Sequence, residues 1–186
     1  MRRHWTSIGA GALVVLCVLA LAGMPAPAEP ADDGLVVPGV RMGRWTLAMS
    51  IDDLTRMHGM PIRVQVQAGL PPAADAVYDH VAFTWDRVPV TATALAGGKR
   101  SEVLSIGFLS AGSRRFATDK GIAFGAIRAD VLRAYGEPTA ETTPQPGETR
   151  FIYDRIGIAF NLSVGRRVSS IAIFRPGTAD RYWHLL

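Results

Sequence analysis

Histidine and cysteine, the residue types that most often hold metals or carry catalysis, are sparse in this sequence. Its single cysteine, Cys17, lies in an apolar N-terminal run, and the histidines beyond residue 28 are His58, His80 and His184. None of them has a second histidine or a carboxylate at ligand spacing on a shared helix face. Asp79 and His80 are adjacent on a predicted strand, so their side chains point to opposite faces. With no nucleophile elbow, phosphate loop or dinucleotide motif present, the sequence predicts no catalytic residue, metal site or cofactor, and it disfavours an enzyme.

Recognition of another protein is the chemistry that the residue types favour. On the predicted strands, small residues occupy the face opposite the apolar one, with aromatic residues and arginine at its ends. Because side chains alternate along a strand, these residues form a shallow open platform. Tyrosine and arginine are frequent in binding hot spots. The alternative is packing, in which this face lies against the other half-sheet or the C-terminal tail. The protein-binding candidates are Tyr78, His80, Tyr153, Arg155 and Phe174.

The elements that would position this platform are encoded twice. Residues 125–138 repeat residues 48–61, which lie 77 positions earlier, with Asp, Arg, Gly and Pro at matching places. Each copy predicts a short amphipathic helix, and Ser50 is the expected N-cap of the first. The helices should end at Gly59 and Gly136, because glycine adopts a positive φ at little cost and a proline follows two residues later.

Two strands are predicted after each helix, and residues 62–77, which contain Gly69 followed by Leu-Pro-Pro, are predicted to be a loop before the first pair. Residues 78–85 and 153–162 alternate strictly, and residues 103–109 and 168–174 complete a hairpin in each copy. Only the first copy carries a long connection, residues 88–101, which predicts a surface excursion or an additional hairpin arm. The predicted buried set is Leu54, Phe83, Trp85, Ile106, Phe108, Val131, Tyr135, Ile158, Phe160, Ile171 and Ile173.

The N-terminus predicts export to the periplasm or beyond the cell. Residues 1–28 combine a basic start, an apolar run shorter than the roughly 18–20 residues of a membrane-spanning helix, and a small-residue cleavage site. An uncleaved anchor and a lipid on Cys17 are the less favoured alternatives. Cleavage removes Arg2 and Arg3, so 18 of the 20 basic residues remain against 16 acidic ones. This near-neutral chain has no stable membrane span and no expected nucleic-acid partner.

The chain is therefore predicted to be an α+β protein made of two tandem copies of a unit that joins a short helix to an antiparallel β-sheet. The two sheets are expected to form one concave surface. The predicted organisation is a signal peptide at residues 1–28, a flexible lead-in at 29–39, the two repeats at 40–113 and 114–178, and an apolar C-terminal tail at 179–186.

A family resemblance is carried by the second copy. Its motif consists of Gly125, Val131, Gly136, Glu137 and Pro138, then an aromatic-led strand with Phe151 and Tyr153, Gly157, and a hairpin ending in Val168, Ile171 and Ile173. This order resembles the small outer-membrane lipoproteins of the β-barrel assembly machinery. The tandem form, over residues 40–177, is similar to the β-lactamase inhibitory protein superfamily, which implies paired helix-and-sheet units with a concave sheet that grips an enzyme. Ala48 replaces the motif's first glycine and no lipid-bearing cysteine is present, so no contact residues are transferred.

These features predict an exported, non-catalytic module that binds a protein partner. Its expected class is an inhibitor or immunity-type protein that acts on an enzyme in or beyond the cell envelope. The alternative is a structural scaffold in outer-membrane or envelope assembly, and an enzyme ranks third. The sequence specifies neither the partner nor the oligomeric state.

Overall fold

The structure is a computed structural model that describes residues 32–67, 79–85, 90–96 and 106–182. The predicted signal peptide and Tyr78 lie outside these residues. The described part contains the α-helices α2 and α3 and two β-sheets whose strands are mostly antiparallel, so the α+β class is confirmed. No helix in the described part is both long enough and apolar enough to span a membrane.

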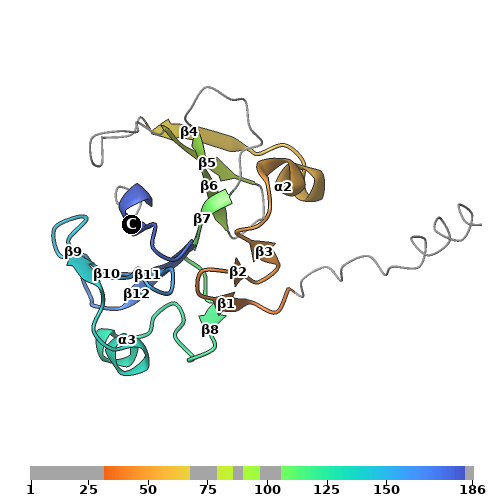
Figure 1. Ribbon diagram of the computed structural model, residues 1–186. Coiled ribbons are helices and arrows are strands. Elements are labelled where there is room, and N and C mark those ends of the chain that lie inside the picture. Colours follow the sequence, from red (N-terminus) through yellow and green to blue (C-terminus); the bar gives the residue numbers. More distant parts are fainter. Residues whose placement is uncertain (1–31, 68–78, 86–89, 97–105, 183–186) are drawn as a thin grey trace, which may run out of the picture.

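The larger sheet has eight strands, and all of its pairings are antiparallel. Their order across the sheet is β4 (Arg63–Gln67), β5 (Asp79–Thr84), β6 (Thr91–Ala96), β7 (Ile106–Ala111), β12 (Val168–Phe174), β11 (Ile158–Leu162), β10 (Thr149–Tyr153) and β9 (Ala140–Thr142). Each half thus consists of four strands that are consecutive in sequence, and the halves join where β7 pairs with β12. Figure 1 shows the two halves meeting at an angle, with both helices on the outer side.

Two of these strands, β4 and β6, were not among the strands predicted from the sequence. β4 falls in residues 62–77, which were predicted to be a loop, and β6 lies within the long connection at residues 88–101. The third strand of the first half is therefore an integral part of the sheet, paired on both sides. The loop prediction is wrong at β4, because the glycine and prolines at residues 69–72 dominated the interpretation of a segment in which Val64 and Val66 alternate with polar residues. β6 agrees with the alternative of an additional hairpin arm.

A turn divides the segment at residues 153–162, which was predicted to be one strand. β10 ends at Tyr153, β11 begins at Ile158, and these two residues are directly opposed in the hairpin. Gly157 adopts φ 72°, and a Cβ placed there would lie 2.1 Å from the carbonyl oxygen of Phe174, so the turn requires glycine. Alternation counted through a turn assigns Tyr153 and Ile158 to opposite faces, whereas cross-strand partners share a face.

The smaller sheet has the order β3 (Trp45–Thr46), β2 (Arg41–Met42), β1 (Leu35–Val37) and β8 (Ala117–Thr118). β1 runs parallel to β8, and Val36 is fully buried. The guanidinium of Arg41 donates two hydrogen bonds of 2.9 Å to the carboxylate of Asp33. The predicted flexible lead-in at residues 29–39 is therefore wrong for residues 33–37. A three-residue strand is too short to show an apolar period, and one of its two pairing partners, β8, is distant in the sequence.

Local sequence signals place the helices as predicted. α2 (Ile51–His58) begins with a capping box, in which the N–H of Asp53 donates to Ser50 Oγ at 3.1 Å and the N–H of Ser50 donates to Asp53 Oδ2 at 2.8 Å. α3 (Arg128–Tyr135) has no side-chain cap at its start. The helices end at Gly59 and Gly136, whose φ angles are 77° and 75°.

The main core lies between the outer face of the large sheet and the layer formed by α2, α3 and the small sheet. It joins residues of both helices, both sheets and both halves, which include Val36, Trp45, Leu54, Phe83, Trp85, Leu109, Val131, Tyr153, Ile158, Phe160, Ile171 and Ile173. The predicted buried set is confirmed except that Tyr135 is only partly buried. The structure does not describe the side chains of Ile106 and Phe108, so their predicted burial stays a prediction.

The inner face of the second half is covered by the chain's own C-terminal segment. The short 3-10 helix η1 (Ala179–Tyr182) lies in the angle of the sheet in Figure 1. Its Ala179 packs in a second core cluster with Ile152, Ala159, Ala172 and Phe174. In the second half, the inner face of the sheet therefore packs against the C-terminal segment, as the alternative to an open platform predicted.

Candidate functional site

Tyr153 belongs to the core and not to an open platform. Its side chain is 5% exposed, and its ring centroid lies 5.5 Å from that of Tyr135 and 6.0 Å from that of Phe160. The hydroxyl donates a 2.9 Å hydrogen bond to the carbonyl oxygen of Gly136, at the end of α3. Burial raises the pKa of Tyr153 to about 12. The assignment of Tyr153 to the open face is therefore wrong, because the residue pairs with Ile158 across the β10–β11 hairpin.

Of the other four candidates, the structure describes the side chains of Phe174 and Arg155. Phe174 is fully buried beneath η1, so its proposed place on an accessible surface is also wrong. Arg155 is exposed in the turn between β10 and β11 and lines a shallow hollow with Tyr135 and Ile156. His80 lies in β5, but the structure does not describe its side chain, and Tyr78 lies outside the described residues.

His58 has a structural environment at the end of α2. The indole Nε1–H of Trp45 donates a 3.1 Å hydrogen bond to His58 Nε2, and the two ring centroids lie 6.0 Å apart. Burial is the main cause that lowers the pKa of His58, which keeps the ring neutral and able to accept this bond. In the described part of the chain, no three His, Cys, Asp or Glu side chains are arranged to hold a metal ion.

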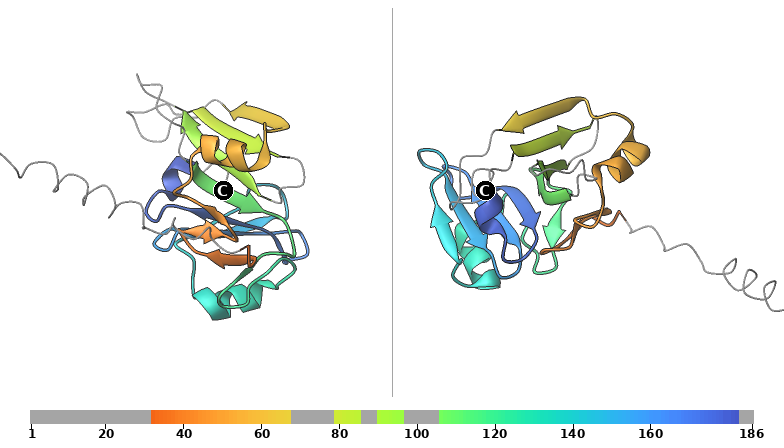
Figure 2. Two further views of the ribbon diagram at one scale, coloured as in Figure 1. Left: turned by 90° about the vertical axis from the view of Figure 1, so that its right-hand side faces the viewer. Right: turned by 45° about the horizontal axis from the view of Figure 1, so that its top comes forward.

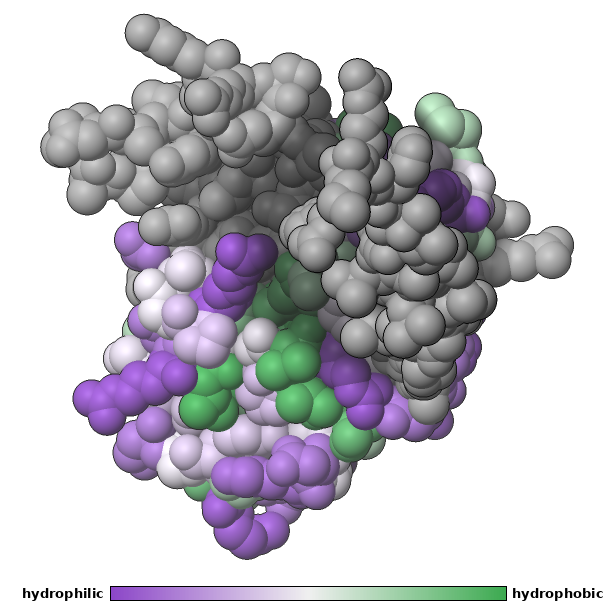
Figure 3. All heavy atoms as spheres, turned by 45° about the vertical axis from the view of Figure 1, so that its right-hand side comes forward, coloured by the Kyte–Doolittle hydropathy of each residue, from purple (hydrophilic) through white to green (hydrophobic). Residues whose placement is uncertain are grey.

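Several large apolar side chains are exposed on the described surface. Figure 3 shows one face on which hydrophobic residues gather near the middle, with hydrophilic residues around them. The exposed large apolar residues are Val40, Met60, Ile62, Val64, Phe124, Ile127, Ile156 and Val164. Three of them, Met60, Ile62 and Val64, follow one another along the start of β4. Another three, Phe124, Ile127 and Val164, lie in the two second-half segments that form the candidate site.

We call this second group and its arginines the arginine tip, which comprises residues 124–128 and 163–167. Backbone hydrogen bonds hold its two segments together. The N–H of Gly125 donates to the carbonyl of Val168 at 2.8 Å, and the N–H of Arg128 donates to the carbonyl of Arg166 at 3.1 Å. Arg167 Nη1 adds a 2.9 Å bond to the carbonyl of Gly125. The exposed apolar residues of the tip are therefore fixed beside its three arginines.

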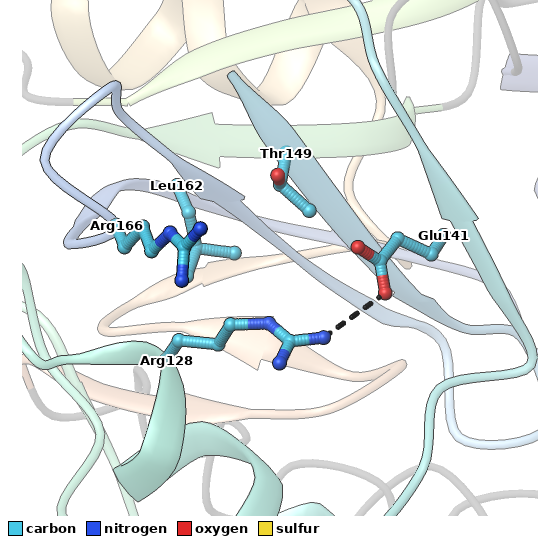
Figure 4. A pocket seen from close by; sticks show the side chains of 5 residues that line it. All are labelled: Arg128, Glu141, Thr149, Leu162 and Arg166. Atoms are coloured by element: carbon cyan, nitrogen blue, oxygen red, sulfur yellow. Dashed lines mark hydrogen bonds and ion pairs between the residues drawn. The ribbon is translucent and has the colours of Figure 1, made fainter. Parts of the chain in front are cut away.

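A small polar hollow opens at the arginine tip (Figure 4). It is lined by Arg128, Glu141, Thr149, Leu162 and Arg166. Arg128 Nη2 lies 3.3 Å from Glu141 Oε2, and its guanidinium carbon lies 5.0 Å from the ring centroid of Phe151. Two guanidinium groups thus face one carboxylate, which leaves a net positive charge that suits an additional carboxylate from a partner.

The sequence contained a signal for this surface that charge counting missed. When only charges are counted, Arg166 and Arg167 are two more basic residues of a turn, although Val164 stands in the same turn. An apolar residue at a turn tip is unusual because turn positions favour Gly, Pro, Asn, Asp and Ser. Val164 is 72% exposed, and only the backbone pairing of its turn with residues 125–128 brings its segment beside the segment of Phe124 and Ile127.

Comparison with known proteins adds little to this geometry. No protein-family model and no curated protein sequence matches the chain. Among solved structures, the chain is similar to the uncharacterized protein yfeY from Escherichia coli, with 12% sequence identity and a TM-score of 0.42. That match covers 79% of this chain and 97% of the other. At this level of similarity, neither fold details nor function are carried over.

Proposed function

We propose that the protein is an exported, non-catalytic module that binds another protein, and that it acts as an inhibitor or immunity-type protein on an enzyme in or beyond the cell envelope. The observation that carries this proposal is the arginine tip, where Phe124, Ile127 and Val164 are exposed beside arginines on a hydrogen-bonded frame. Arginine and large apolar groups are enriched in protein interfaces, and a rigid frame reduces the entropy lost on binding.

The proposal includes a tandem repeat with a concave inner surface. Its support is the common order of the two halves, since α2 and α3 are each followed by four sequential antiparallel strands. The angle between the halves leaves the helices outside and η1 inside (Figure 1). Because η1 covers the second half of the inner face, the arginine tip replaces the predicted platform as the principal contact surface.

The charge of the tip defines the partner that it fits. Arg128 and Arg166 line one hollow with a single carboxylate, Glu141, and Arg167 adds a third positive charge nearby, so a matching surface carries Asp or Glu around an apolar centre. Charge complementarity of this kind favours association rate and specificity. The partner is therefore expected to bind more weakly at high salt.

The proposal is tested by capturing envelope and secreted proteins on the immobilised mature chain. Two tip variants, Val164→Asp and Arg166→Glu, are each expected to lower the affinity for a captured partner at least about tenfold. Arg175→Glu is the matched control, because it makes the same charge change at an exposed residue away from the tip. All three variants should keep the parent melting temperature, since exposed substitutions cost little stability.

Equal capture by parent, tip variants and control would overturn the arginine tip as the binding site. Capture of an enzyme whose activity falls on binding supports the inhibitor proposal. Capture of an outer-membrane assembly protein, with the chain recovered in membrane fractions, would favour the scaffold alternative instead.

A further inference from the structure

The two edges of the large sheet differ in how well they are protected from pairing with another strand. β9 at one edge has three residues, carries Glu141 and lies between Pro138 and Pro144. Short length, charge and proline are features that protect an edge. β4 at the other edge is longer, with five residues, although it too carries a charge, Arg63, and begins two residues after a proline, Pro61. In both views of Figure 2, no other described element lies along the outer side of β4.

The longer edge strand, β4, also exposes apolar side chains. Ile62, just before β4, is 68% exposed, and Val64 is 52% exposed although it stands opposite the buried Phe83. The N–H of Ile62 bonds to the carbonyl of Thr84 at 2.8 Å, so this residue continues the hairpin with β5. An edge strand with free backbone groups and an apolar stripe gains both hydrogen bonds and buried area when another strand is added.

The sequence of β4 identifies a second copy of this chain as the strand that fits. When two β4 strands lie antiparallel about a two-fold axis at Val64, Val64 is opposite Val64, Arg63 is opposite Gln65, and Ile62 is opposite Val66. Apolar positions then share one face and polar positions the other. No like charges are opposed, whereas an axis at Arg63 would place two arginines together. An interface of this kind is self-complementary, as two-fold symmetry requires.

We propose that the mature protein forms a symmetric dimer through antiparallel β4–β4 pairing centred on Val64, which extends the large sheet across both copies. This surface belongs to the first half of the sheet and shares no residue with the arginine tip. The dimer is therefore independent of the proposed partner-binding function, and either can fail without the other.

Cysteine cross-linking tests the register directly, because residues 29–186 contain no cysteine. In the proposed pairing, Val64→Cys places the two new thiols on directly opposed residues, about 4.5–5.5 Å apart between Cα atoms and within disulfide range. Gln65→Cys is the matched control, because its own symmetry mate lies two residues further along the partner strand, beyond about 7 Å. Under mild oxidation, Val64→Cys should form a covalent dimer several-fold faster than Gln65→Cys.

Analytical ultracentrifugation of the mature protein, with no cysteine introduced, measures the oligomeric state independently. The parent should sediment as a dimer at micromolar concentration, and Val64→Lys should be monomeric because lysine at an edge opposes strand pairing. Val164→Lys is the control at another exposed valine and should remain dimeric. A parent that is monomeric up to 100 µM, or cross-linking at Gln65→Cys that equals Val64→Cys, would overturn the proposal.

Discussion

At the scale of single residues, burial decides what Tyr153 does. A tyrosine can serve as a binding residue or as part of a core, and the composition of the chain does not separate the two. Here the ring packs on Tyr135 and Phe160, and the hydroxyl bonds to the carbonyl that ends α3. Its side chain therefore links the second helix to the sheet.

Truncation of this side chain should destabilise the fold. Tyr153→Ala is expected to lower the free energy of unfolding by about 3–5 kcal/mol, because it leaves a cavity in the core. Tyr153→Phe, which loses only the bond to Gly136, should cost about 0.5–1.5 kcal/mol. Chemical denaturation measures both values, with Arg155→Ala as the exposed neighbour that should change stability by less than about 0.5 kcal/mol. Equal stability of Tyr153→Ala and the parent would place this residue outside the core.

The raised pKa of Tyr153 also predicts an alkaline loss of stability. An unfolded tyrosine ionises near pH 10, whereas burial raises the pKa of Tyr153 in the fold to about 12. Between these values the unfolded state loses a proton that the folded state retains, so stability falls as the pH rises. Denaturation curves between pH 9 and pH 12 should fall less steeply for Tyr153→Phe than for the parent. Parallel slopes would mean that another group causes the alkaline transition.

At the scale of the element, the two helices begin in different ways. α2 carries its start signal in its own sequence, as the reciprocal bonds between Ser50 and Asp53 show. α3 has Ile127 at the N-cap position and no side-chain cap. The first N–H of α3 is instead satisfied by the carbonyl of Arg166, which comes from the distant turn of the arginine tip.

Removal of the local cap should weaken α2. Ser50→Ala is expected to lower the free energy of unfolding by about 0.5–2 kcal/mol, because the N–H of Asp53 loses its acceptor. Ser50→Thr keeps a hydroxyl at the same position and should retain most of the stability. Thermal melts of the two variants beside the parent make the comparison. A Ser50→Ala protein that melts with the parent would show that tertiary packing alone holds this helix.

At the scale of the whole molecule, the small sheet ties together segments from both halves. β1 precedes α2 and pairs with β8, which precedes α3, and Val36 lies at the centre of that contact. The N-terminal segment is thus a structural part of the domain from Asp33 onward. The proposed dimer edge and the arginine tip then lie on different halves of this single core.

The contribution of β1 is open to measurement. Val36→Ala should lower the free energy of unfolding by about 2 kcal/mol, because two buried carbon atoms are lost from a tightly packed site. Val40→Ala is the matched control, since Val40 is 53% exposed and should be nearly neutral. If the two variants were equally stable, β1 would be peripheral, as the predicted flexible lead-in implied.

The sequence by itself determined the features that depend on interactions within a few residues. The bounds of α2 follow from Ser50 and Gly59, and the end of α3 follows from Gly136. Alternation within the strands correctly assigned Ile158, Phe160, Ile171 and Ile173 to the core. These predictions succeeded because caps and strand faces are set by local hydrogen bonds and by a fixed two-residue period.

Only the tertiary structure decided the features that depend on strand pairing. The hairpin turn after Tyr153 shifted that residue to the buried face, and η1 covered Phe174 from a segment further along the chain. β6, in a segment of threonine and small residues, is a strand paired on both sides, and the arginine tip forms by pairing segments about 40 residues apart. Such contacts join positions whose separation carries no sequence period, so burial and exposure at these sites are properties of the assembled sheet.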